Sequence, residues 1–395
     1  MLGVDVASVE QLCTPAGREL LEQATRATDE DPDPLRVQAA LRRRAAPDLV
    51  ASALTQVALR RRAQAKFGDL AAVMLFTPDG LEQSTRLPVA AHRAARLVAA
   101  GTGSVVDLGC GIGGDLVALA RAGITCAGVD LDPVRVAVAR ANLAALGLGG
   151  AVAVADATTV DTAPFDVAFA DPARRTARGR TFDADGWTPP WPFVEGLLRR
   201  DSCVKTAPGI PHDLVPAGVE AEWVSDHREV KEAVLWSGRL ATTARRATVI
   251  GDGGLATLTE VEDPGPEAVG VGPVSAYLHE PDGAVVRAGL VTAVAAIVGG
   301  HLVDEHIAYV TSPNAVRTPF ARCYRVLEEV PYREKPLRAA LRERDVGRLT
   351  IKKRGVAVVP EELRKRLSLR GDQEATLVLT RVAGRGTALL VEPVT

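Results

Sequence analysis

The fold is decided by Val105-Val106-Asp107-Leu108-Gly109-Cys110-Gly111-Ile112-Gly113-Gly114-Asp115. A short apolar run ends at an aspartate, and four glycines follow within six residues. A chain that turns sharply from a strand into a helix close to a ligand needs glycine there, because side chains would block the approach. This stretch therefore predicts a strand, a ligand-binding loop and a helix.

Short apolar runs alternate with helical stretches on the C-terminal side of this loop. They read SVVDLG, DLVALARAG, ITCAGVDLD, VRVAVARANLAALG, AVAVADA and FDVAFADPA between residues 104 and 173. This alternation predicts an α/β core with a doubly wound, mostly parallel sheet of the Rossmann-like type. Further strands are expected over 202–205, 221–223 and 232–235. We expect an antiparallel hairpin over 246–259 to close the sheet.

The remaining segments suggest additional domains. Apolar residues recur every three or four positions up to residue 70, which predicts an N-terminal helical domain over 1–80. A loop is expected next, and then a helix over 88–100. The α/β core would occupy 81–262, a connecting α/β segment 263–330, and a small α/β module 331–395. In that module we expect helices over 336–344 and 360–366 and strands over 348–353, 375–382 and 387–391.

Two segments of the chain are strongly basic. The formal net charge is −2 over 395 residues, but residues 36–66 carry +7 and residues 331–371 carry +8, leaving −17 for the rest. Basic segments around an acidic core suit a protein that neutralises phosphates, although solvated helix faces give the same count.

Five isolated cysteines indicate a reducing environment. They include no CxxC motif or Cys/His cluster, which argues against a disulfide framework and against a metal site. The N-terminal residues lack the pattern of a secretory signal, and the sequence contains no stretch of about 18 apolar residues. We therefore expect a cytoplasmic protein with neither metal nor membrane partner.

Acidic residues follow four of the expected strands. Asp107 ends the first strand, and Asp130 lies 21 residues after Gly109, where a carboxylate can accept hydrogen bonds from ribose hydroxyls. These two features also fit an NAD-dependent oxidoreductase. The third and fourth strands end at Asp156 and Asp171. The acidic-proline corner Asp171-Pro172 favours another class, because nicotinamide enzymes have no need of one.

The glycine loop and this corner resemble two motifs of class I methyltransferases. The loop is similar to their motif I, and Asp171-Pro172-Ala173-Arg174 is similar to the D-P-P-[YFR] corner of enzymes that methylate nucleobases. The resemblance implies S-adenosylmethionine as cofactor and Asp171, Pro172 and Arg174 as catalytic residues. It implies a cofactor site made of Gln83, Thr85, Arg86, Asp107, Gly109, Cys110, Gly111, Gly113, Asp115, Asp130, Leu131, Asp156, Ala157 and Asp171.

Methyl transfer from a sulfonium is an in-line displacement, so the enzyme mainly has to position an electron-rich atom. The Asp171 carboxylate and the carbonyl beside Pro172 could accept the protons of an exocyclic amine. Ala173 replaces the second proline of the motif, and Arg174 stands where an aromatic ring would stack on a base, which leaves the target atom open. Other candidate contacts to the base are Arg175, Trp187 and Trp191.

Carbon methylation of uracil would need a cysteine nucleophile. Cys203 is the candidate in this region, but its position at the start of a predicted buried strand favours a core residue.

The chain as a whole resembles a bacterial group of methyltransferases with an N-terminal helical region and a C-terminal THUMP-like domain. The residues that carry this resemblance are 80–86, 92–94, 107–115, 171–175, 351–355 and 360–364. THUMP domains present tRNA to fused enzymes, so the resemblance implies an RNA substrate, tRNA or rRNA, contacted by Lys352, Lys353 and Arg354. Two alternatives stay open: a methyltransferase for small molecules or proteins, and a catalytically silent RNA-binding protein that keeps the cofactor.

Overall fold

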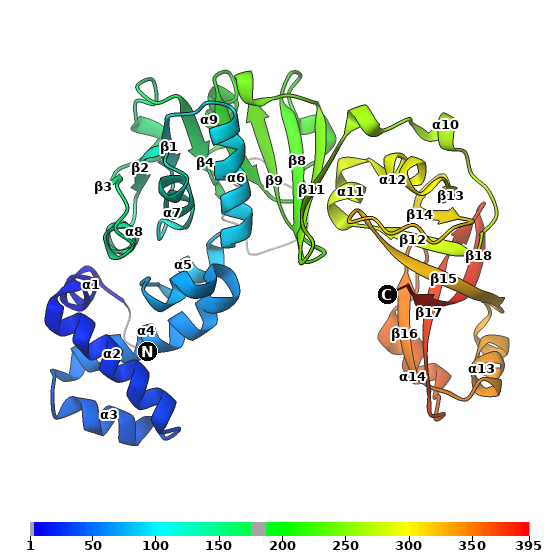
Figure 1. Cartoon of the computed structure of the whole chain (residues 1–395), viewed down its shortest axis with the longest axis horizontal. Helices are drawn as coiled ribbons and strands as arrows, with labels where there is room; N and C mark the ends of the chain where they lie inside the picture. Colours follow the sequence, from blue (N-terminus) through cyan, green and yellow to red (C-terminus); the bar gives the residue numbers. More distant parts are fainter. Residues whose placement is uncertain (1–3, 175–186, 395) are drawn as a thin grey trace. The chain divides into compact units, whose positions relative to one another are not determined.

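The computed structural model describes residues 4–174 and 187–394. The chain forms two compact units (Figure 1). The first comprises Met1–Thr206, Ile210–Val219 and Val234–Thr242, and the second comprises Ala207–Gly209, Glu220–Ala233 and Thr243–Thr395. Within the described residues, no helix has both the length and the apolar character needed to cross a membrane.

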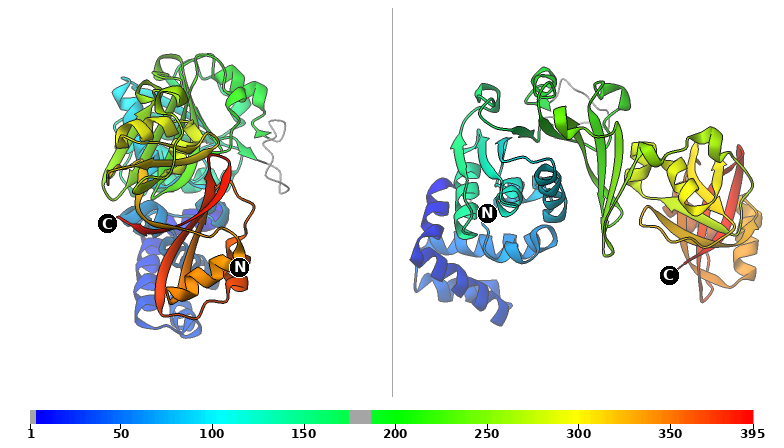
Figure 2. Two further views of the ribbon diagram at one scale, coloured as in Figure 1. Left: turned by 90° about the vertical axis from the view of Figure 1, so that its right-hand side faces the viewer. Right: turned by 45° about the horizontal axis from the view of Figure 1, so that its top comes forward.

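Four helices open the first unit, blue in Figures 1 and 2: α1 (Val6–Cys13), α2 (Pro15–Glu30), α3 (Pro34–Arg42) and α4 (Pro47–Phe67). Side-chain oxygens of Asp5, Thr14 and Asp33 cap the first three, and proline begins each of the last three. Their buried side chains belong to one hydrophobic core with those of the α/β sheet. The expected boundary at residue 80 therefore does not separate two cores.

The segment between the helices and the sheet is more ordered than the sequence suggested. Part of the expected loop is a helix, α5 (Pro78–Gln83), because Thr77 caps its first turn and Pro78 begins it. α6 follows over Leu87–Ala99. The Lys66 ammonium at the end of α4 donates to the carbonyl oxygens of Leu81 and Ser84 at 2.8 and 3.0 Å, which fixes the chain between the two helices.

Five parallel strands form one side of the sheet in the order β3-β2-β1-β4-β7, with β3 at the edge. They are β1 (Ser104–Leu108), β2 (Thr125–Asp130), β3 (Ala151–Val154), β4 (Val167–Ala170) and β7 (Ser202–Thr206). Three helices connect them: α7 (Gly114–Arg121), α8 (Pro133–Ala145) and α9 (Trp191–Leu197). The order reverses between β1 and β4, and ligands of such sheets bind at this position, at the carboxyl ends of the strands. The predicted fold class is confirmed.

The predicted hairpin forms, and it closes one edge of the sheet as expected. The full order is β11-β10-β8-β9-β7-β4-β1-β2-β3, so β8 (Glu220–Asp226) and β9 (Glu229–Ser237) lie between the hairpin and β7. The hairpin strands are β10 (Arg245–Gly251) and β11 (Gly254–Thr259). Polar contacts join β8 to the hairpin: the buried carboxylates of Glu220 and Glu222 on β8 bind Arg246 and Thr248 of β10 at 2.6 and 2.5 Å.

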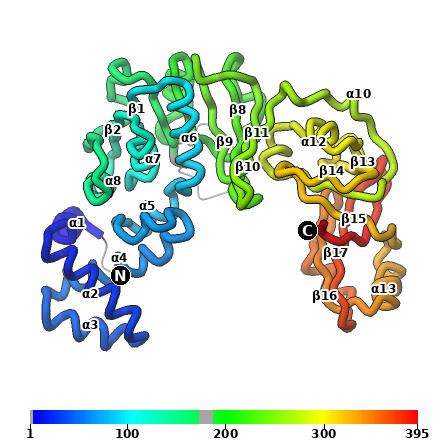
Figure 3. The backbone as a smooth tube through the Cα atoms, viewed as in Figure 1, coloured from blue at the N-terminus to red at the C-terminus, as the bar shows by residue number. Residues whose placement is uncertain are grey.

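The second unit also contains a seven-stranded sheet of order β13-β14-β12-β15-β18-β17-β16. Its strands are β12 (Tyr277–Pro281), β13 (His301–Asp304), β14 (Ile307–Ser312), β15 (Ala321–Val330), β16 (Val346–Lys353), β17 (Gln373–Val382) and β18 (Arg385–Pro393). The helices are α10 (Pro266–Val269), α11 (Gly283–Ala288), α12 (Val291–Val298), α13 (Glu334–Glu343) and α14 (Pro360–Leu367). β15 pairs with β12 on one side and with β18 on the other. The backbone of this sheet can be followed from β13 to β17 in Figure 3. The expected boundary at 330 is therefore not a boundary between sheets.

A buried amide joins three segments of the first unit. The Asn142 side chain on α8 accepts from the Leu75 N–H at 2.7 Å and donates to the carbonyls of Leu75 and Ile112 at 3.1 and 2.9 Å. It is fully buried, so water cannot replace these bonds. This one side chain ties α8 to the segment before α5 and to the glycine loop.

We predict that Asn142→Leu lowers the free energy of unfolding by about 3 kcal/mol, because three buried backbone groups lose a partner at about 1 kcal/mol each. Urea unfolding followed by circular dichroism measures the change. Asn314→Leu, at an exposed position, is the control and should stay within about 0.5 kcal/mol of the wild type. Equal stability of the two variants would contradict the role of Asn142.

Candidate active site

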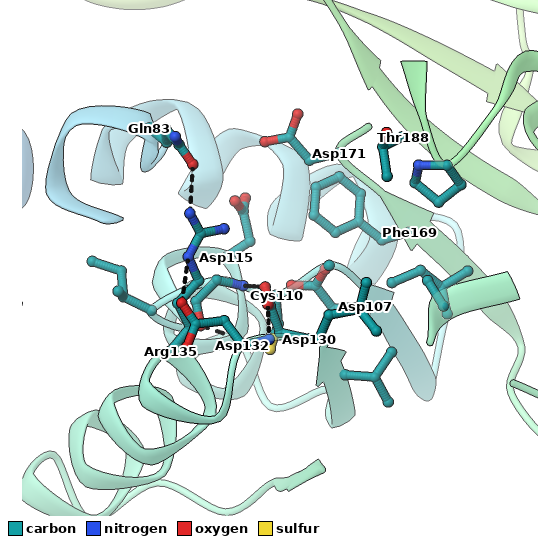
Figure 4. Close-up of a pocket in the computed structure, with 18 of the residues that line it drawn as sticks. Gln83, Asp107, Cys110, Asp115, Asp130, Asp132, Arg135, Phe169, Asp171 and Thr188 are labelled. Atoms are coloured by element: carbon teal, nitrogen blue, oxygen red, sulfur yellow. Dashed lines mark hydrogen bonds and ion pairs between the residues drawn. The ribbon is translucent and has the colours of Figure 1, made fainter. Parts of the chain in front are cut away.

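A cavity of about 810 Å³ lies at the carboxyl ends of the parallel strands of the first unit (Figure 4). Most of the residues expected at a cofactor site line it: Gln83, Thr85, Asp107, Gly109, Cys110, Gly111, Asp115, Asp130, Leu131, Asp156, Ala157 and Asp171. Its size is that of an ordinary small-molecule site.

The glycine loop leaves part of the cavity wall without side chains. Gly109 and Gly111 have φ angles of +108° and +54°, and a Cβ atom on either would meet nothing within 4 Å. The N–H groups of Gly109 and Cys110 both donate to the Val129 carbonyl at 2.9 Å, which holds the loop against β2. Gly113 has a different role: a Cβ there would lie 3.0 Å from that of Ala139, so this glycine permits close packing of α7 on α8.

Asp130 links the glycine loop to the end of β2. Its carboxylate accepts the Gly111 N–H at 3.0 Å and the Asp132 N–H at 2.9 Å. Its orientation is therefore fixed, and each oxygen keeps a lone pair for a ligand hydroxyl. The adjacent Leu131 is 60% exposed, and this apolar side chain forms part of the cavity wall.

Asp156 has a local structural role in addition to its place on the wall. One of its oxygens accepts from the N–H and the hydroxyl of Thr158 at 2.9 and 2.7 Å. The backbone hydrogen bond, followed by the hydroxyl, lowers the pKa of Asp156. The side chain thus caps a short turn that carries Ala157 into the cavity.

Asp107 is the most deeply buried carboxyl of the cavity, 1% exposed, and its Oδ1 has no hydrogen-bond partner in the part of the chain that the structure describes. Burial raises the pKa of Asp107 well above its ordinary value, and the charges of Asp115 and Asp171 raise it further. Arg93 acts in the opposite direction. A buried oxygen of this kind is stabilised by a donor or a positive charge from a ligand.

A chain of polar contacts connects three sides of the cavity. The Thr85 hydroxyl donates to Asp115 Oδ2 at 2.9 Å and accepts from Lys205 Nζ at 3.2 Å. Lys205 Nζ also donates to Asp171 Oδ2 at 2.6 Å. Asp171, the proposed catalytic carboxylate, is therefore held in an ion pair.

Sequence reasoning missed two basic residues of this network. Lys205 is the penultimate residue of β7, close to the edge of the sheet where ligands bind, and a lone charge near the end of an apolar strand is a usable signal. Arg93 is 2% exposed, binds Asp115 and lies 4.7 Å above the Phe169 ring. A buried arginine on a helix gives no comparable signal, since helix periodicity does not distinguish it from a surface residue.

Several expected site residues do not line the cavity. The Arg86 guanidinium donates to the Ala65 carbonyl at 3.1 Å. Pro172 is buried, and Trp187 is buried with its ring 5.2 Å from that of Trp191. The cavity wall is instead completed there by Thr188, Pro189 and Pro190. Trp187 is thus a core residue, whereas Trp191 is half-buried and its indole N–H donates to the Glu195 carboxylate at 3.0 Å. Neither tryptophan lines the cavity as the expected base-stacking surface.

Other predicted positions lie elsewhere. The backbone of Arg174 is in β5 (Ala173–Arg174), its side chain is not described, and Arg175 lies outside the described residues. Cys203 is fully buried in β7, as expected for a core residue. The three residues expected to contact RNA belong to the second unit and do not line this cavity: Lys352, Lys353 and Arg354.

Comparison with known proteins agrees with this geometry. Residues 105–176 match a family described as a methyltransferase domain, residues 321–393 a THUMP domain-like family, and residues 5–63 a domain of unknown function (DUF8688). Two Mycobacterium tuberculosis proteins, from strains CDC 1551 and H37Rv, are described as uncharacterized S-adenosylmethionine-dependent methyltransferases. Each is 40% identical over 349 residues, which cover 85% of this chain and 93% of the relative.

This chain belongs to the S-adenosylmethionine-dependent methyltransferases. A crystal structure from Porphyromonas gingivalis W83, whose description assigns it provisionally to the methyltransferases, has the same fold. It aligns with a TM-score of 0.74 and 22% identity over 95% of this chain and 98% of the other. The C-terminal domain of this methyltransferase is THUMP-like.

The cavity of the methyltransferase fits its cofactor chemically. S-adenosylmethionine carries a sulfonium and an ammonium, and the cavity offers the unpartnered buried oxygen of Asp107 together with the carboxylates of Asp115 and Asp171. The open backbone at Gly109 and Gly111 and the fixed carboxylate of Asp130 suit a nucleoside with ribose hydroxyls.

We predict that Asp107→Asn changes the pH dependence of stability. The folded-state pKa of Asp107 lies above the unfolded value, so the folded state binds more protons and stability falls as pH rises from the unfolded to the folded pKa. The variant lacks this loss, so its free energy of unfolding at pH 8 should be about 1–2 kcal/mol higher than that of the wild type. This is the usual cost of burying a polar group without a hydrogen-bond partner. Urea unfolding between pH 4 and 8 measures it.

Asp166→Asn provides a control of opposite sign. Backbone hydrogen bonds from Gly103 and Ser104 lower the pKa of Asp166, so the wild-type carboxylate contributes stability above its unfolded pKa and loses it as pH falls. The Asp166 variant should therefore be less stable than the wild type at neutral pH. Identical pH profiles for wild type and Asp107→Asn would exclude Asp107 as the titrating group.

Proposed function

We propose that this methyltransferase transfers a methyl group to a base nitrogen of RNA, tRNA or rRNA. The observation that carries the proposal is the position of Asp171, which follows β4, lines the cavity and is paired with Lys205. A base edge offers N–H donors next to oxygen or nitrogen acceptors. A carboxylate beside an ammonium is the complementary pair.

For the cofactor we propose the following contacts. Asp130 would accept hydrogen bonds from the ribose hydroxyls, Leu131 would lie against the adenine, and Asp156 and Ala157 would contact its edge. The methionine end would lie near Gln83, Thr85, Asp107 and Asp115. When bound, S-adenosylmethionine supplies an electrophilic methyl group on sulfur. Arg86, Gly113 and Pro172 are not included, since they do not line the cavity.

The residues of the corner would orient the acceptor. Asp171 accepts a hydrogen bond from the acceptor N–H, which turns the nitrogen lone pair toward the cofactor. Lys205 keeps the carboxylate in place through the 2.6 Å contact and can donate to a neighbouring acceptor atom of the base. Thr85 accepts a hydrogen bond from Lys205 and donates one to Asp115, which fixes the position of the Lys205 ammonium at the cavity wall. Positioning of this kind contributes most of the rate enhancement in a displacement with little acid–base chemistry.

The support for RNA comes from the second unit. Its THUMP-like match covers residues 321–393. Many of its basic side chains are, however, engaged: Lys352 binds Glu280 at 2.7 Å, and Arg354 lies 5.2 Å over the Tyr309 ring. Lys353, Lys365 and Arg370 are among the exposed basic residues of this unit that form no ion pair within the described part of the chain. We therefore assign phosphate contacts to Lys353 in preference to Lys352.

We also propose that the protein works in the cytoplasm. All five cysteines are free thiols, which fits a reducing compartment.

We predict that Asp130→Ala weakens S-adenosylmethionine binding 10- to 100-fold, because charge-assisted hydrogen bonds contribute about 1.5–3 kcal/mol each. Isothermal titration calorimetry measures the dissociation constant. Asp161→Ala is the matched control, since this aspartate only accepts from the Ala163 N–H in an exposed turn. Unchanged affinity in Asp130→Ala would exclude the proposed ribose contact.

We predict that the enzyme methylates RNA isolated from cells that lack its gene. Incorporation of labelled methyl groups, followed by mass spectrometry of the nucleosides, identifies the product. Asp171→Asn and Lys205→Met should lower kcat by at least about 100-fold, with S-adenosylmethionine affinity within about 3-fold. Lys231→Met is the matched control: the Lys231 side chain is 16% exposed and pairs with Glu229, but it does not line the cavity, so this variant should retain activity. Methylation of protein or small molecules in place of RNA would overturn the proposed substrate.

A further inference from the structure

A second cavity, of about 680 Å³, lies within the second unit. Its walls come from the turn between β8 and β9, the turn between β10 and β11, and residues 317–322. We propose that this cavity is an anion site that binds a phosphate group, and that its source is the phosphodiester backbone of RNA. Only the choice of RNA rests on the proposed function. The anion site itself rests on the side chains that line the cavity.

The β8–β9 turn places two basic side chains in an unusual backbone conformation. His227 and Arg228 are the two residues of this turn, with φ angles of +49° and +67°. Glycine, asparagine and aspartate dominate such positions, because other side chains clash with the backbone. In the β17–β18 turn Ala383 and Gly384 take positive φ, and Gly254 does so at the start of β11. Among the described residues, His227 and Arg228 are the only basic residues with positive φ, which indicates that their side chains have a use.

His227 is held rigidly at the mouth of the cavity. One ring nitrogen lies 2.7 Å from Asp226 Oδ1 and the other 3.1 Å from Asp252 Oδ1. The hydrogen bond to Asp226, followed by that to Asp252, raises the pKa of His227 and favours the imidazolium form. The ring thus joins the two turns that form opposite walls.

Three arginines supply the positive charge. Arg228, Arg317 and Arg322 line the cavity and are exposed. Arg228 and Arg317 have no hydrogen-bond acceptor or ion-pair partner among the described residues, whereas Arg322 contacts the Tyr324 hydroxyl at 3.5 Å. An arginine without a carboxylate partner is available to a phosphate, whose oxygens match the guanidinium fork.

The balance of charge around the cavity is positive. Asp226 and Asp252 are occupied by His227, and Glu280, opposite Arg322 on β12, is occupied by Lys352 at 2.7 Å. Within residues 4–174 and 187–394, no carboxylate therefore neutralises Arg228 or Arg317. The wall formed by the β10–β11 turn includes Gly251, Gly253 and Gly254, where a Cβ atom would meet nothing within 4 Å, so a bulky anion can approach the backbone.

The test compares two double variants of the full chain with the same loss of charge. Arg228→Gly/Arg317→Ala removes the two unpaired arginines, and glycine suits the positive φ at 228, so the turn is kept. Arg325→Ala/Arg348→Ala removes two surface arginines paired with Glu392 and Glu374. Thermal unfolding verifies that both variants fold.

The first probe is a fluorescein-labelled, single-stranded RNA of 20 nucleotides and mixed sequence, measured by anisotropy between 50 and 300 mM KCl. We expect the cavity variant to bind about 10-fold more weakly at 100 mM KCl. Its slope of log affinity against log salt should fall by about 1.4, since each phosphate contact on a single strand contributes about 0.7. The control variant should match the wild type.

The second probe is adenosine monophosphate or inorganic phosphate, measured by calorimetry. Binding that is lost only in the cavity variant, with RNA affinity unchanged, would keep the anion site and assign it to free phosphate compounds. Equal behaviour of both variants toward RNA, the nucleotide and phosphate would overturn the site. If the wild type methylates RNA and both double variants bind RNA with equal affinity, this inference alone is overturned. If the cavity variant loses RNA binding but the wild type does not methylate RNA, only the proposed function is overturned.

Discussion

The active site of this methyltransferase depends on the contact between the glycine loop and the end of β2. The Val129 carbonyl accepts two backbone N–H groups of the loop, and the Asp130 carboxylate accepts a third. These bonds hold Gly109 and Gly111 in left-handed conformations, with their open sides toward the cavity. The side-chain amide of Asn142 donates a hydrogen bond to the Ile112 carbonyl and so anchors the loop to α8. The shape of the cavity is thus set mainly by backbone groups.

An excess of negative charge gives this cavity its chemical preference. The carboxylates of Asp107, Asp115, Asp130, Asp132, Asp156 and Asp171 line it, against the cations Arg135 and Lys205. Arg93 forms an ion pair with Asp115, and Lys205 forms one with Asp171, so the charges of these two carboxylates are partly neutralised. Asp107 has no such partner for its Oδ1. A ligand with two positive centres is therefore stabilised here, whereas an anionic dinucleotide is repelled.

The second unit shows why a count of charges along the chain is a poor guide to a binding surface. The segment 331–371 carries +8, but ion pairs with Glu328, Glu334, Glu374 and Glu280 engage many of its basic residues. Two of these partners, Glu280 and Glu328, precede the segment. Arg228 and Arg317, which have no ion-pair partner among the described residues, lie outside both basic segments of the sequence.

The sequence by itself determined the alternating strands and helices, the glycine loop and the acidic residues at the strand ends, because these depend on local periodicity and spacing. It could not determine which side chains meet across the fold. Lys205 and Asp171 are 34 residues apart, and Arg93 and Asp115 are 22 apart, so these ion pairs depend on strand order. The placement of β8 and β9 between the β10–β11 hairpin and β7 and the burial of Trp187 were likewise decided by tertiary structure. Long-range hydrogen bonds and core packing, which no local pattern encodes, select those arrangements.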